Sequence, residues 1–516
     1  MARKIRKIPA TMATQHPDNA SAPYWETGNG SSKVTLVKKD GFVSAQEELT
    51  ECVSAFEKLG VGEFMWDWEG KHVDEAVIDK LYTVYHHFCQ KNRIGRDVFL
   101  TFRIPNIWHE KGYSLLRAFM VILTSEDFAK DLGFKDRPLF EVILPMTEKA
   151  EELMYIQTSF HKLARFKYKT FIHTKPNTDC IEVIPLVESV EGQMEIRKLL
   201  SRYVDLYKKE FRVKPIYIRP FLARSDPALI SGLLATVLAN KIALSEIATF
   251  SRIYKIPTYP IIGAGSLPFR GGLNPEGIKT FLQQYGGVRT ATIQSGFRYD
   301  YPLPQVKRAI NQLNKNIAKT KAIIIPEQEL AVLRSIVKKS AQVYQDTLQK
   351  ITKDMAPLFA AVPRRRERRL HVGLLSYNRQ VGKSKLPRAI NFTAAFYTLG
   401  IPPEFIGLGR VLNGLTKEEL QLVKKYYPTM GINLKQAGAY LNRKNLEQLS
   451  QEKRGWKLIK QDVELTEKLL GISLQPRGVE AQEHVRLSSQ TVRLFANRKK
   501  LEKLIIKTGK LRKSLG

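Results

Sequence analysis

Ile181-Glu-Val-Ile-Pro-Leu-Val187 is an apolar run of strand length, and the amphipathic helical pattern of Gln193–Phe211 follows it directly. A short buried strand followed by a longer helix is the repeating unit of parallel α/β folds. The same unit recurs along the chain, so this stretch decides which fold class we expect.

Seven further apolar runs have the length and composition of buried strands. They lie at Glu63–Trp68, Val98–Phe102, Leu139–Leu144, Pro215–Ile218, Tyr259–Ile262, Thr290–Gln294 and His371–Leu375. Helical patterns such as Asp74–Asn92, Ser114–Leu132 and Ala228–Tyr254 lie between them. Eight strands alternating with helices favour an α/β fold of the closed (β/α)8 TIM-barrel type. The alternative is an open doubly wound sheet, but no Gly-x-Gly-x-x-Gly follows the first strand.

The barrel does not account for the whole chain, which we treat as one domain over residues 1–516. Residues 1–40 are rich in Gly, Ser, Asn and Pro and predict a loop segment. The barrel is expected over 60–400, with 304–362 as a helical insertion before the eighth strand. Residues 403–516 predict an appended, mostly helical C-terminal region with additional helices.

Composition excludes several classes of protein. Hydrophobic residues at 43% and charged residues at 26% are ordinary for a soluble globular chain. No run approaches 18 uninterrupted apolar residues, so we expect no membrane span. The cysteines, Cys52, Cys89 and Cys180, have neither metal-ligand spacing nor a plausible disulfide pattern, which indicates a reducing cytoplasmic location.

The charge balance is strongly positive. Lys and Arg number 83 against 50 acidic residues, giving +33. The basic residues are densest in Arg364–Arg369 and in the tail from Arg498 to Lys513. This charge attracts anions, and a basic nucleic-acid-binding protein whose tail carries the function is one alternative. We expect no specific nucleic-acid partner, because the chain has no zinc-finger spacing, RNA-binding aromatic signature or helix-turn-helix pattern.

Polar side chains follow almost every predicted strand. They include Glu69, Arg103, Glu188, Arg219, Arg224, Asp226, Arg270, Arg298 and Arg379. In a barrel the carboxyl ends of the strands form the active site. Converging arginines repel one another unless an anion lies between them, so the pattern predicts a ligand that carries phosphate and carboxylate groups.

One of these arginines lies in the glycine-rich stretch Gly263-Ala-Gly-Ser-Leu-Pro-Phe-Arg270-Gly-Gly272. Glycines let a backbone approach a ligand closely, and the guanidinium matches carboxylate or phosphate geometry. Such loops are also common as plain tight turns, so the stretch carries weight only beside the other strand ends.

Two carboxylates suggest a metal site. Glu188 directly follows one predicted strand and Asp226 follows the next, and neighbouring strand ends lie close together in a barrel. Two carboxylates plus water and substrate oxygens is a usual way to hold Mg²⁺. The alternative is an ion pair with Arg219 or Arg224. His16, in Thr14-Gln-His-Pro-Asp-Asn19, is a further candidate because Pro17 and Asp18 can hold the imidazole in a fixed turn.

Taken together and in order, these motifs resemble phosphoenolpyruvate carboxylase of the short archaeal type. The motifs are Thr14–Asn19, Ile184–Ser189, Arg224–Pro227, Gly263–Gly272, Gln294–Asp300, Tyr377–Arg379 and Leu386–Ile390. The resemblance implies carboxylation of phosphoenolpyruvate by bicarbonate to oxaloacetate and phosphate, through carboxyphosphate and enolpyruvate. It also implies a role in replenishing the tricarboxylic acid cycle, and a homotetramer.

The resemblance also implies residue roles. Glu188 and Asp226 would hold Mg²⁺ or Mn²⁺, and His16 would orient carboxyphosphate. Arg270 and Arg379 would stabilise the carboxylation intermediates. Arg388, Arg103 and Arg298 would bind phosphate, and Gly271 and Gly272 would belong to a mobile loop that closes over the substrate.

Two positions depart from the longer bacterial and plant form. Ala264 stands where that form has an arginine, and Leu229 stands where it has a lysine. Arg298, Arg219 or Arg224 are candidates to replace those contacts. The alternative enzyme is another metal-dependent barrel lyase or aldolase acting on an enolate, which would not need His16 or so many arginines.

Overall fold

The computed structural model describes residues 6–14, 47–68, 73–109, 112–172, 180–363, 380–382 and 384–516. Eight parallel strands form a closed barrel in which each strand pairs with its neighbours in chain order. They are β1 (Thr11–Thr14), β2 (Glu63–Asp67), β3 (Phe99–Arg103), β4 (Glu141–Leu144), β5 (Glu182–Val187), β6 (Phe221–Ala223), β7 (Ile261–Gly263) and β8 (Thr290–Ile293). The expected TIM-type barrel is therefore confirmed.

One barrel strand was not predicted. The eighth strand is β1, within the segment predicted as loop, and it closes the barrel by pairing with both β2 and β8. Its four residues are too short a run to stand out beside the glycine- and serine-rich sequence that follows. The strand predicted at 371–375 lies outside the described residues. Residues 304–362 follow the last barrel strand, so they are not an insertion before an eighth one.

A strand was predicted at Pro215–Ile218, but the observed strand, β6, lies further along the chain at Phe221–Ala223. Ile218 makes only an isolated bridge to Thr258, because Pro220 has no N–H to continue the ladder. Pro220 instead accepts a hydrogen bond through its carbonyl from the Ile261 N–H at 2.8 Å. The displacement matters because it moves Arg219 from the end of a strand to the beginning of one.

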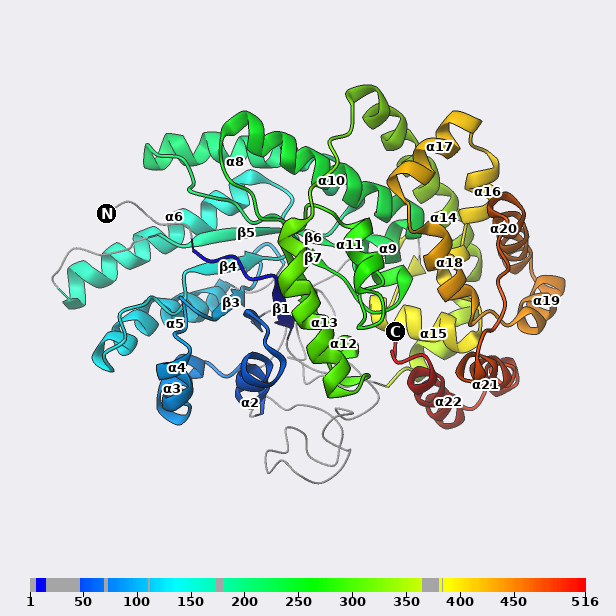
Figure 1. Cartoon of the computed structure of the whole chain (residues 1–516), viewed down its shortest axis with the longest axis horizontal. Helices are drawn as coiled ribbons and strands as arrows, with labels where there is room; N and C mark the ends of the chain where they lie inside the picture. Colours follow the sequence, from blue (N-terminus) through cyan, green and yellow to red (C-terminus); the bar gives the residue numbers. More distant parts are fainter. Residues whose placement is uncertain are drawn as a thin grey trace.

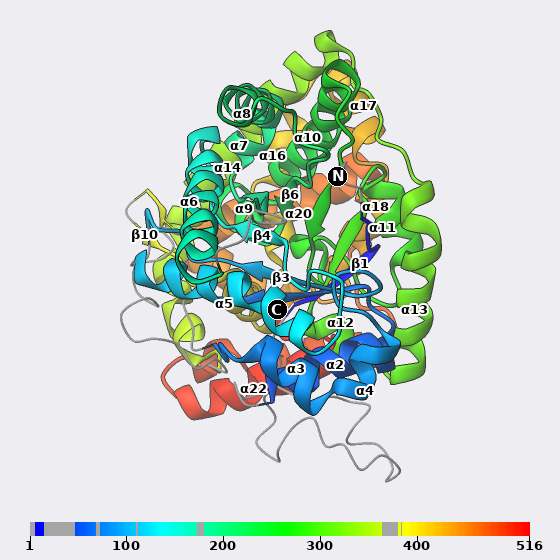
Figure 2. The same ribbon diagram turned by 90° about the vertical axis from the view of Figure 1, so that its left-hand side faces the viewer.

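Helices surround the barrel on the outside (Figure 1, Figure 2). They are α2 (Glu48–Ser54), α3 (Val77–Val84), α4 (His86–Lys91), α5 (Gly112–Asp131), α6 (Ala150–Lys167), α7 (Val190–Met194), α8 (Ile196–Phe211), α9 (Ser225–Ser231), α10 (Leu233–Tyr254), α11 (Ile278–Gln284), α12 (Ser295–Tyr299) and α13 (Leu303–Asn316). Single-turn π and 3₁₀ segments lie at η1 (Ala55–Leu59), η2 (Tyr168–Ile172), η3 (Pro268–Arg270) and η4 (Ile317–Lys319). The α10 helix is long and apolar enough to cross a membrane, but 89% of that window is buried, as in a core helix.

A second group of helices packs beside the barrel, on the right in Figure 1. It comprises α14 (Glu327–Ala361), α15 (Ala389–Leu399), η5 (Pro403–Phe405), α16 (Leu408–Asn413), α17 (Lys417–Tyr426), α18 (Met430–Gly438), α19 (Arg443–Glu452), α20 (Arg454–Leu470), α21 (Val479–Ser488), η6 (Val492–Leu494) and α22 (Arg498–Leu511). A short hairpin of β9 (Gln380–Val381) and β10 (Ser384–Lys385) precedes α15. This helical region shares one hydrophobic core with α10, so it packs continuously against the barrel's outer layer.

A buried ionic cluster fills the amino end of the barrel. Arg219 is 1% exposed and lies 2.7 Å from Glu63 and 2.6 Å from Glu141, at the first residues of β2 and β4. Arg6 joins the same two carboxylates. Burial raises the pKa of Glu63, but Arg219 and Arg6 outweigh it and hold that pKa at about 2. Arg219 therefore lies at the opposite end from the predicted site and cannot supply the phosphate contact considered for it.

Candidate active site

Glu188 and Asp226 lie at the carboxyl ends of two hydrogen-bonded strands. The last ladder pair of β5 and β6 joins Val187 to Leu222. Glu188 follows Val187 directly, and Asp226 lies in the first turn of α9. Both side chains are half-buried, and the backbone N–H of Met146 donates to Glu188 Oε2 at 2.9 Å.

The chemistry of this pair suits a hard divalent cation. Carboxylate oxygens are preferred ligands of Mg²⁺, which usually keeps several waters and takes one or two carboxylates from the protein. The described residues contain no cluster of three or more His, Cys, Asp or Glu side chains with metal-ligand geometry. A two-carboxylate site completed by substrate and water is thus the arrangement that the described residues fit.

Arg270 lies at the end of the next strand along the barrel. Its side chain is 7% exposed, and Nε donates to Ser225 Oγ at 3.1 Å while Nη2 donates to Gln294 Oε1 at 2.7 Å. Nη1 donates to the backbone oxygen of Gly516. Segments that follow β6 and β8, together with the last residue of the chain, therefore orient one guanidinium, and its contact Ser225 directly precedes Asp226.

The glycine-rich loop packs tightly in this structure. Gly271 has φ +120°, and a Cβ there would lie 2.7 Å from Ala264 Cβ and 3.0 Å from Arg224 Cγ. Gly272 has φ +70°. Both positions therefore require glycine for conformational reasons, and Gly271 also for space.

The helical region anchors this loop. The N–H of Phe269 donates to Glu404 Oε1 at 2.8 Å, and Tyr397 donates to the same oxygen at 2.6 Å. The Phe269 ring stacks on Phe392 with centroids 5.8 Å apart. Burial raises the pKa of Glu404 to about 7. Loop mobility stays a prediction, and any opening would have to release these contacts.

Arg224 is buried directly beneath the loop. Nε donates to the hydroxyl of Tyr285 at 3.0 Å and Nη2 to the carbonyl of Pro268 at 3.4 Å. Its position after β6 places it at the carboxyl end, as expected. The side chain contacts the loop through the Pro268 carbonyl and is fully buried.

Arg103 forms a two-pronged ion pair. Nε and Nη2 donate to the two carboxylate oxygens of Asp67 at 2.8 and 2.7 Å. Asp67 and Arg103 are the last residues of the paired strands β2 and β3. The guanidinium fork that was predicted to bind phosphate is thus turned toward a neighbouring strand in this structure.

Arg298 holds the end of β1. It lies 2.9 Å from Glu51 and donates to the carbonyl of Thr14, while Tyr299 donates to Glu51 at 2.5 Å. The side chain is fully buried. Thr14 is two residues before His16, so Arg298 fixes the strand from which the predicted histidine segment departs.

Three further residues were predicted for the site, Arg388, His16 and Arg379. Arg388 is half-buried at the N-cap of α15, and Ile390 lines a small polar cavity with Arg270, Gln294 and Gly516. His16 and Arg379 lie outside the described residues. The structure therefore brings Glu188, Asp226, Arg270 and the two glycines to neighbouring strand ends.

Several residues at this end were not predicted. They are Glu51, Asp67, Gln193, Ser225, Glu404 and Gly516. Only Asp67 had a signal, since it lies near the end of a predicted strand whose neighbour in the chain order is the strand before Arg103. Glu404 lies 135 residues from its loop partner and Gly516 lies 246 from Arg270, so no local pattern marks them.

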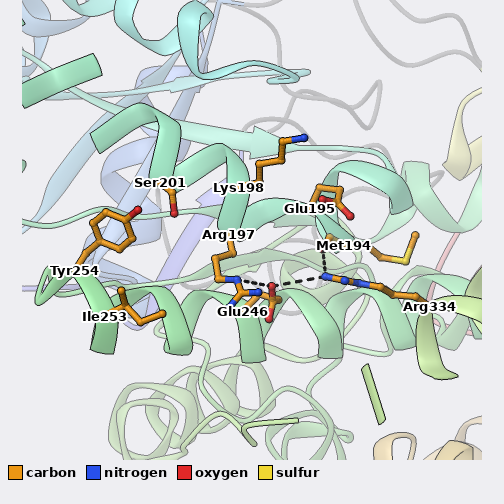
Figure 3. A pocket seen from close by; sticks show the side chains of 9 residues that line it. All are labelled: Met194, Glu195, Arg197, Lys198, Ser201, Glu246, Ile253, Tyr254 and Arg334. Atoms are coloured by element: carbon orange, nitrogen blue, oxygen red, sulfur yellow. Dashed lines mark hydrogen bonds and ion pairs between the residues drawn. The ribbon is translucent and has the colours of Figure 1, made fainter. Parts of the chain in front are cut away.

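A groove of about 360 Å³ lies outside the barrel, between α7, α8, α10 and α14 (Figure 3). Glu246 lies at its base between Arg197, at 2.9 Å, and Arg334, at 3.7 Å. Burial raises the pKa of Glu246. The groove contains none of the predicted site residues, and its charges join helices of the outer layer.

The chain matches known proteins over nearly its full length. A family model described as phosphoenolpyruvate carboxylase matches residues 8–516. Phosphoenolpyruvate carboxylase of Oenococcus oeni is 44% identical over 95% of each chain, and that of Leuconostoc mesenteroides is 42% identical over 94% of each. The Metallosphaera sedula protein of the same name is 34% identical over 99% of this chain and all of its own.

Proposed function

The chain belongs to the phosphoenolpyruvate carboxylase family, and on that premise we propose how its residues carry out the reaction. As a carboxy-lyase of this family it converts phosphoenolpyruvate and bicarbonate to oxaloacetate and phosphate. A bicarbonate oxygen bonds to phosphorus while the bond to the enol oxygen breaks, leaving carboxyphosphate and the enolate of pyruvate. Carboxyphosphate then separates into phosphate and CO₂, and the enolate carbon bonds to CO₂.

We assign the metal to Glu188 and Asp226, whose carboxylates would hold Mg²⁺ or Mn²⁺. When bound, such an ion neutralises charge on phosphate and enolate oxygens. The supporting observation is that both acids leave the same pair of hydrogen-bonded strands at the barrel's carboxyl end. Met146 restrains one Glu188 oxygen through its backbone N–H, which limits the orientation of that carboxylate.

Arg270 would stabilise the negative charge that moves from the enol oxygen onto the carboxylated product. Its fork is already oriented by Ser225 and Gln294, so little reorganisation is needed when charge develops. Arg379 would share this role. Arg388, Arg103 and Arg298 would bind the phosphate group, and this requires Arg103 to exchange its contact with Asp67 and Arg298 its contact with Glu51.

His16 would orient carboxyphosphate and accept its proton. The enolate and carboxyphosphate are both destroyed by stray protons or water, so the site needs shelter while they exist. The loop with Gly271 and Gly272 would supply that shelter. Its closed packing against Arg224 is consistent with such a cover.

We further propose a cytoplasmic homotetramer. The cytoplasmic assignment is supported by three free cysteines, two of them buried, and by the metabolic substrates. The tetramer rests on resemblance to the family. Light scattering of the purified protein would test it directly, since a monomer or dimer of 59.0 kDa chains has a clearly different mass.

The observation that supports the proposed function is that Glu188, Asp226 and Arg270 follow the consecutive strands β5, β6 and β7 in a chain that the family model matches. Oxaloacetate formation coupled to a reporter dehydrogenase, with parallel measurement of phosphate, tests it. We expect turnover only with added bicarbonate, and one phosphate released per oxaloacetate. Bicarbonate-independent consumption of the substrate would instead indicate a lyase or aldolase.

A further inference from the structure

A buried amide bridges the carboxyl ends of β5 and β6, the strands that precede the two acids. Gln193 in α7 is fully buried, and its Nε2 donates to the carbonyl of Ala223 at 2.7 Å and to that of Val187 at 3.3 Å. Val187 immediately precedes Glu188, and Ala223 lies three residues before Asp226. One side chain thus links the backbone from which both acids depart.

A second buried amide fixes the first. Asn240 of α10 is fully buried and donates through Nδ2 to Gln193 Oε1 at 2.7 Å and to the Ala223 carbonyl at 3.3 Å. Since the Gln193 oxygen accepts from Asn240, its nitrogen must face the two carbonyls. The hydrogen-bond pattern therefore allows only one orientation of the Gln193 amide.

Both ends of α7 make hydrogen bonds. Near its start, Ser189 Oγ accepts from the Gly192 N–H at 3.0 Å, and a Cβ on Gly192 would lie 2.9 Å from Val187 Cγ1. At its end, Arg334 donates to the Met194 carbonyl at 3.2 Å and joins Arg197 around Glu246 (Figure 3). A shift of the helix that carries Gln193 would therefore break the buried Gln193 hydrogen bonds and the part-buried bond between Arg334 and Met194.

We propose that Gln193, supported by Asn240, is a positioning residue that sets the separation of the Glu188 and Asp226 carboxylates. The ladder between β5 and β6 ends at Val187 and Leu222, so ladder hydrogen bonds do not fix the spacing beyond that pair. The Gln193 amide supplies the missing cross-link. The proposal rests on the metal assignment above.

Loss of Gln193 should change the affinity for the divalent cation even when no substrate is bound. Mg²⁺ and Mn²⁺ bind tightly only when their ligands keep a narrow geometry. Groups that orient metal ligands without touching the metal typically contribute about 10–100-fold in metal affinity when they are removed. Gln193 should therefore affect the dissociation constant for the ion in the absence of substrate.

A matched control exists in the helical region. Asn445 is 3% exposed, and its Nδ2 also bridges two carbonyls, those of Leu399 at 2.8 Å and Ser488 at 2.9 Å. Loss of either amide leaves two buried carbonyls without that donor, so both changes should lower stability similarly. Only the Gln193 change should alter the metal site.

The experiment compares Gln193→Met, Asn240→Ala and Asn445→Leu in the full-length protein. The Mn²⁺ dissociation constant is measured by electron paramagnetic resonance without substrate, beside the melting temperature. We expect about 10–100-fold weaker Mn²⁺ binding for Gln193→Met, a smaller loss for Asn240→Ala and unchanged binding for Asn445→Leu. Asn240→Ala keeps the test decisive if Gln193→Met does not fold, because it leaves Gln193 in place.

Unchanged Mn²⁺ affinity in the folded Gln193 and Asn240 variants would overturn the proposal. Equal weakening in the Asn445 variant would also do so, since the effect would then be general destabilisation. Asp226→Asn is measured in the same series. If it weakens Mn²⁺ binding and Gln193→Met does not, only the positioning role fails; if it does not, the metal assignment itself fails.

Discussion

Two arginines stand at opposite ends of the three-residue strand β6 and have different surroundings. Arg219, before the strand, is ion-paired with Glu63 and Glu141 at the amino end of the barrel. Arg224, after the strand, donates to a tyrosine hydroxyl and a backbone carbonyl. Its Nη1 is buried without a hydrogen-bond partner among the described residues.

The difference indicates that the amino end of the barrel serves stability, whereas the carboxyl end serves substrate binding and catalysis. At the amino end the positive charges are cancelled by carboxylates, so the cluster fixes strand ends and attracts no substrate. At the carboxyl end, a tyrosine hydroxyl and a backbone carbonyl orient Arg224, and a serine hydroxyl and an amide oxygen orient Arg270. Such arginines can still stabilise an anionic substrate.

The sharpest test of this contrast is Asp226→Asn at the carboxyl end. Loss of one of two carboxylate ligands should reduce metal-dependent turnover by about 10³-fold or more, because the ion neutralises the reacting charge. The melting temperature should hardly change. Asp205→Asn, an exposed acid on α8, is the control and should keep normal kcat. Activity within a few-fold of the parent protein would refute the metal assignment.

At the amino end of the barrel, substitution of an arginine should lower the stability of the protein and leave its activity unchanged. Arg219→Met leaves Glu63 and Glu141 buried without their main partner, which typically costs about 3–5 kcal/mol. The folded fraction should keep its kcat. Thermal or urea unfolding measures the loss.

The control for that change is Arg202→Met, which removes an exposed pair with Glu151 and should cost less than about 1 kcal/mol. If Arg219→Met instead abolished turnover in a fully folded protein, the division between the two ends would be wrong.

Arg270→Lys tests whether the fork itself matters. Lysine keeps the charge but cannot contact Ser225, Gln294 and Gly516 at once. We expect kcat to fall by about 10²–10³-fold, comparable to loss of a transition-state donor, with a smaller change in KM. Arg252→Lys, at an exposed position of α10, should have no effect. Equal kcat in the two variants would show that charge alone suffices.

The smallest expected effect is a pH dependence of opposite sign at the two ends. Burial raises the pKa of Glu404 to about 7, so the folded state holds its proton more tightly and stability falls as pH rises from about 4.5 to 7. Glu404→Gln keeps an oxygen for Phe269 and Tyr397 but cannot ionise. The difference in melting temperature between this variant and the parent protein should therefore increase as pH rises over that interval. The increase should correspond to about 3 kcal/mol in the free energy of unfolding.

The amino end supplies the contrast. With its pKa held at about 2, Glu63 contributes stability above about pH 4.5 that is lost as pH falls toward 2. Glu63→Gln should remove this acid sensitivity. If the melting temperatures of Glu404→Gln and the parent protein changed in parallel between pH 4.5 and 7, the raised pKa assigned to Glu404 would be wrong.

Much of the barrel was predictable because strand length and apolar continuity are local properties. Glu63–Trp68 and Ile181–Val187 were found for that reason, and the adjacency of Glu188 and Asp226 followed from strand order. The prediction failed at β1 and β6. There a four-residue strand and a proline, respectively, weakened the local pattern.

The sequence by itself determined the barrel, the family and the pair of acids on consecutive strands. Only the tertiary structure decided which arginines have their charge cancelled, because Arg219 meets Glu63 across 156 residues of chain. It also decided that Glu404 anchors the loop and that Gln193 ties two strand ends together. Apolar periodicity is set by neighbours along the chain, whereas the partner of a buried charge or amide is set by which distant segments pack together.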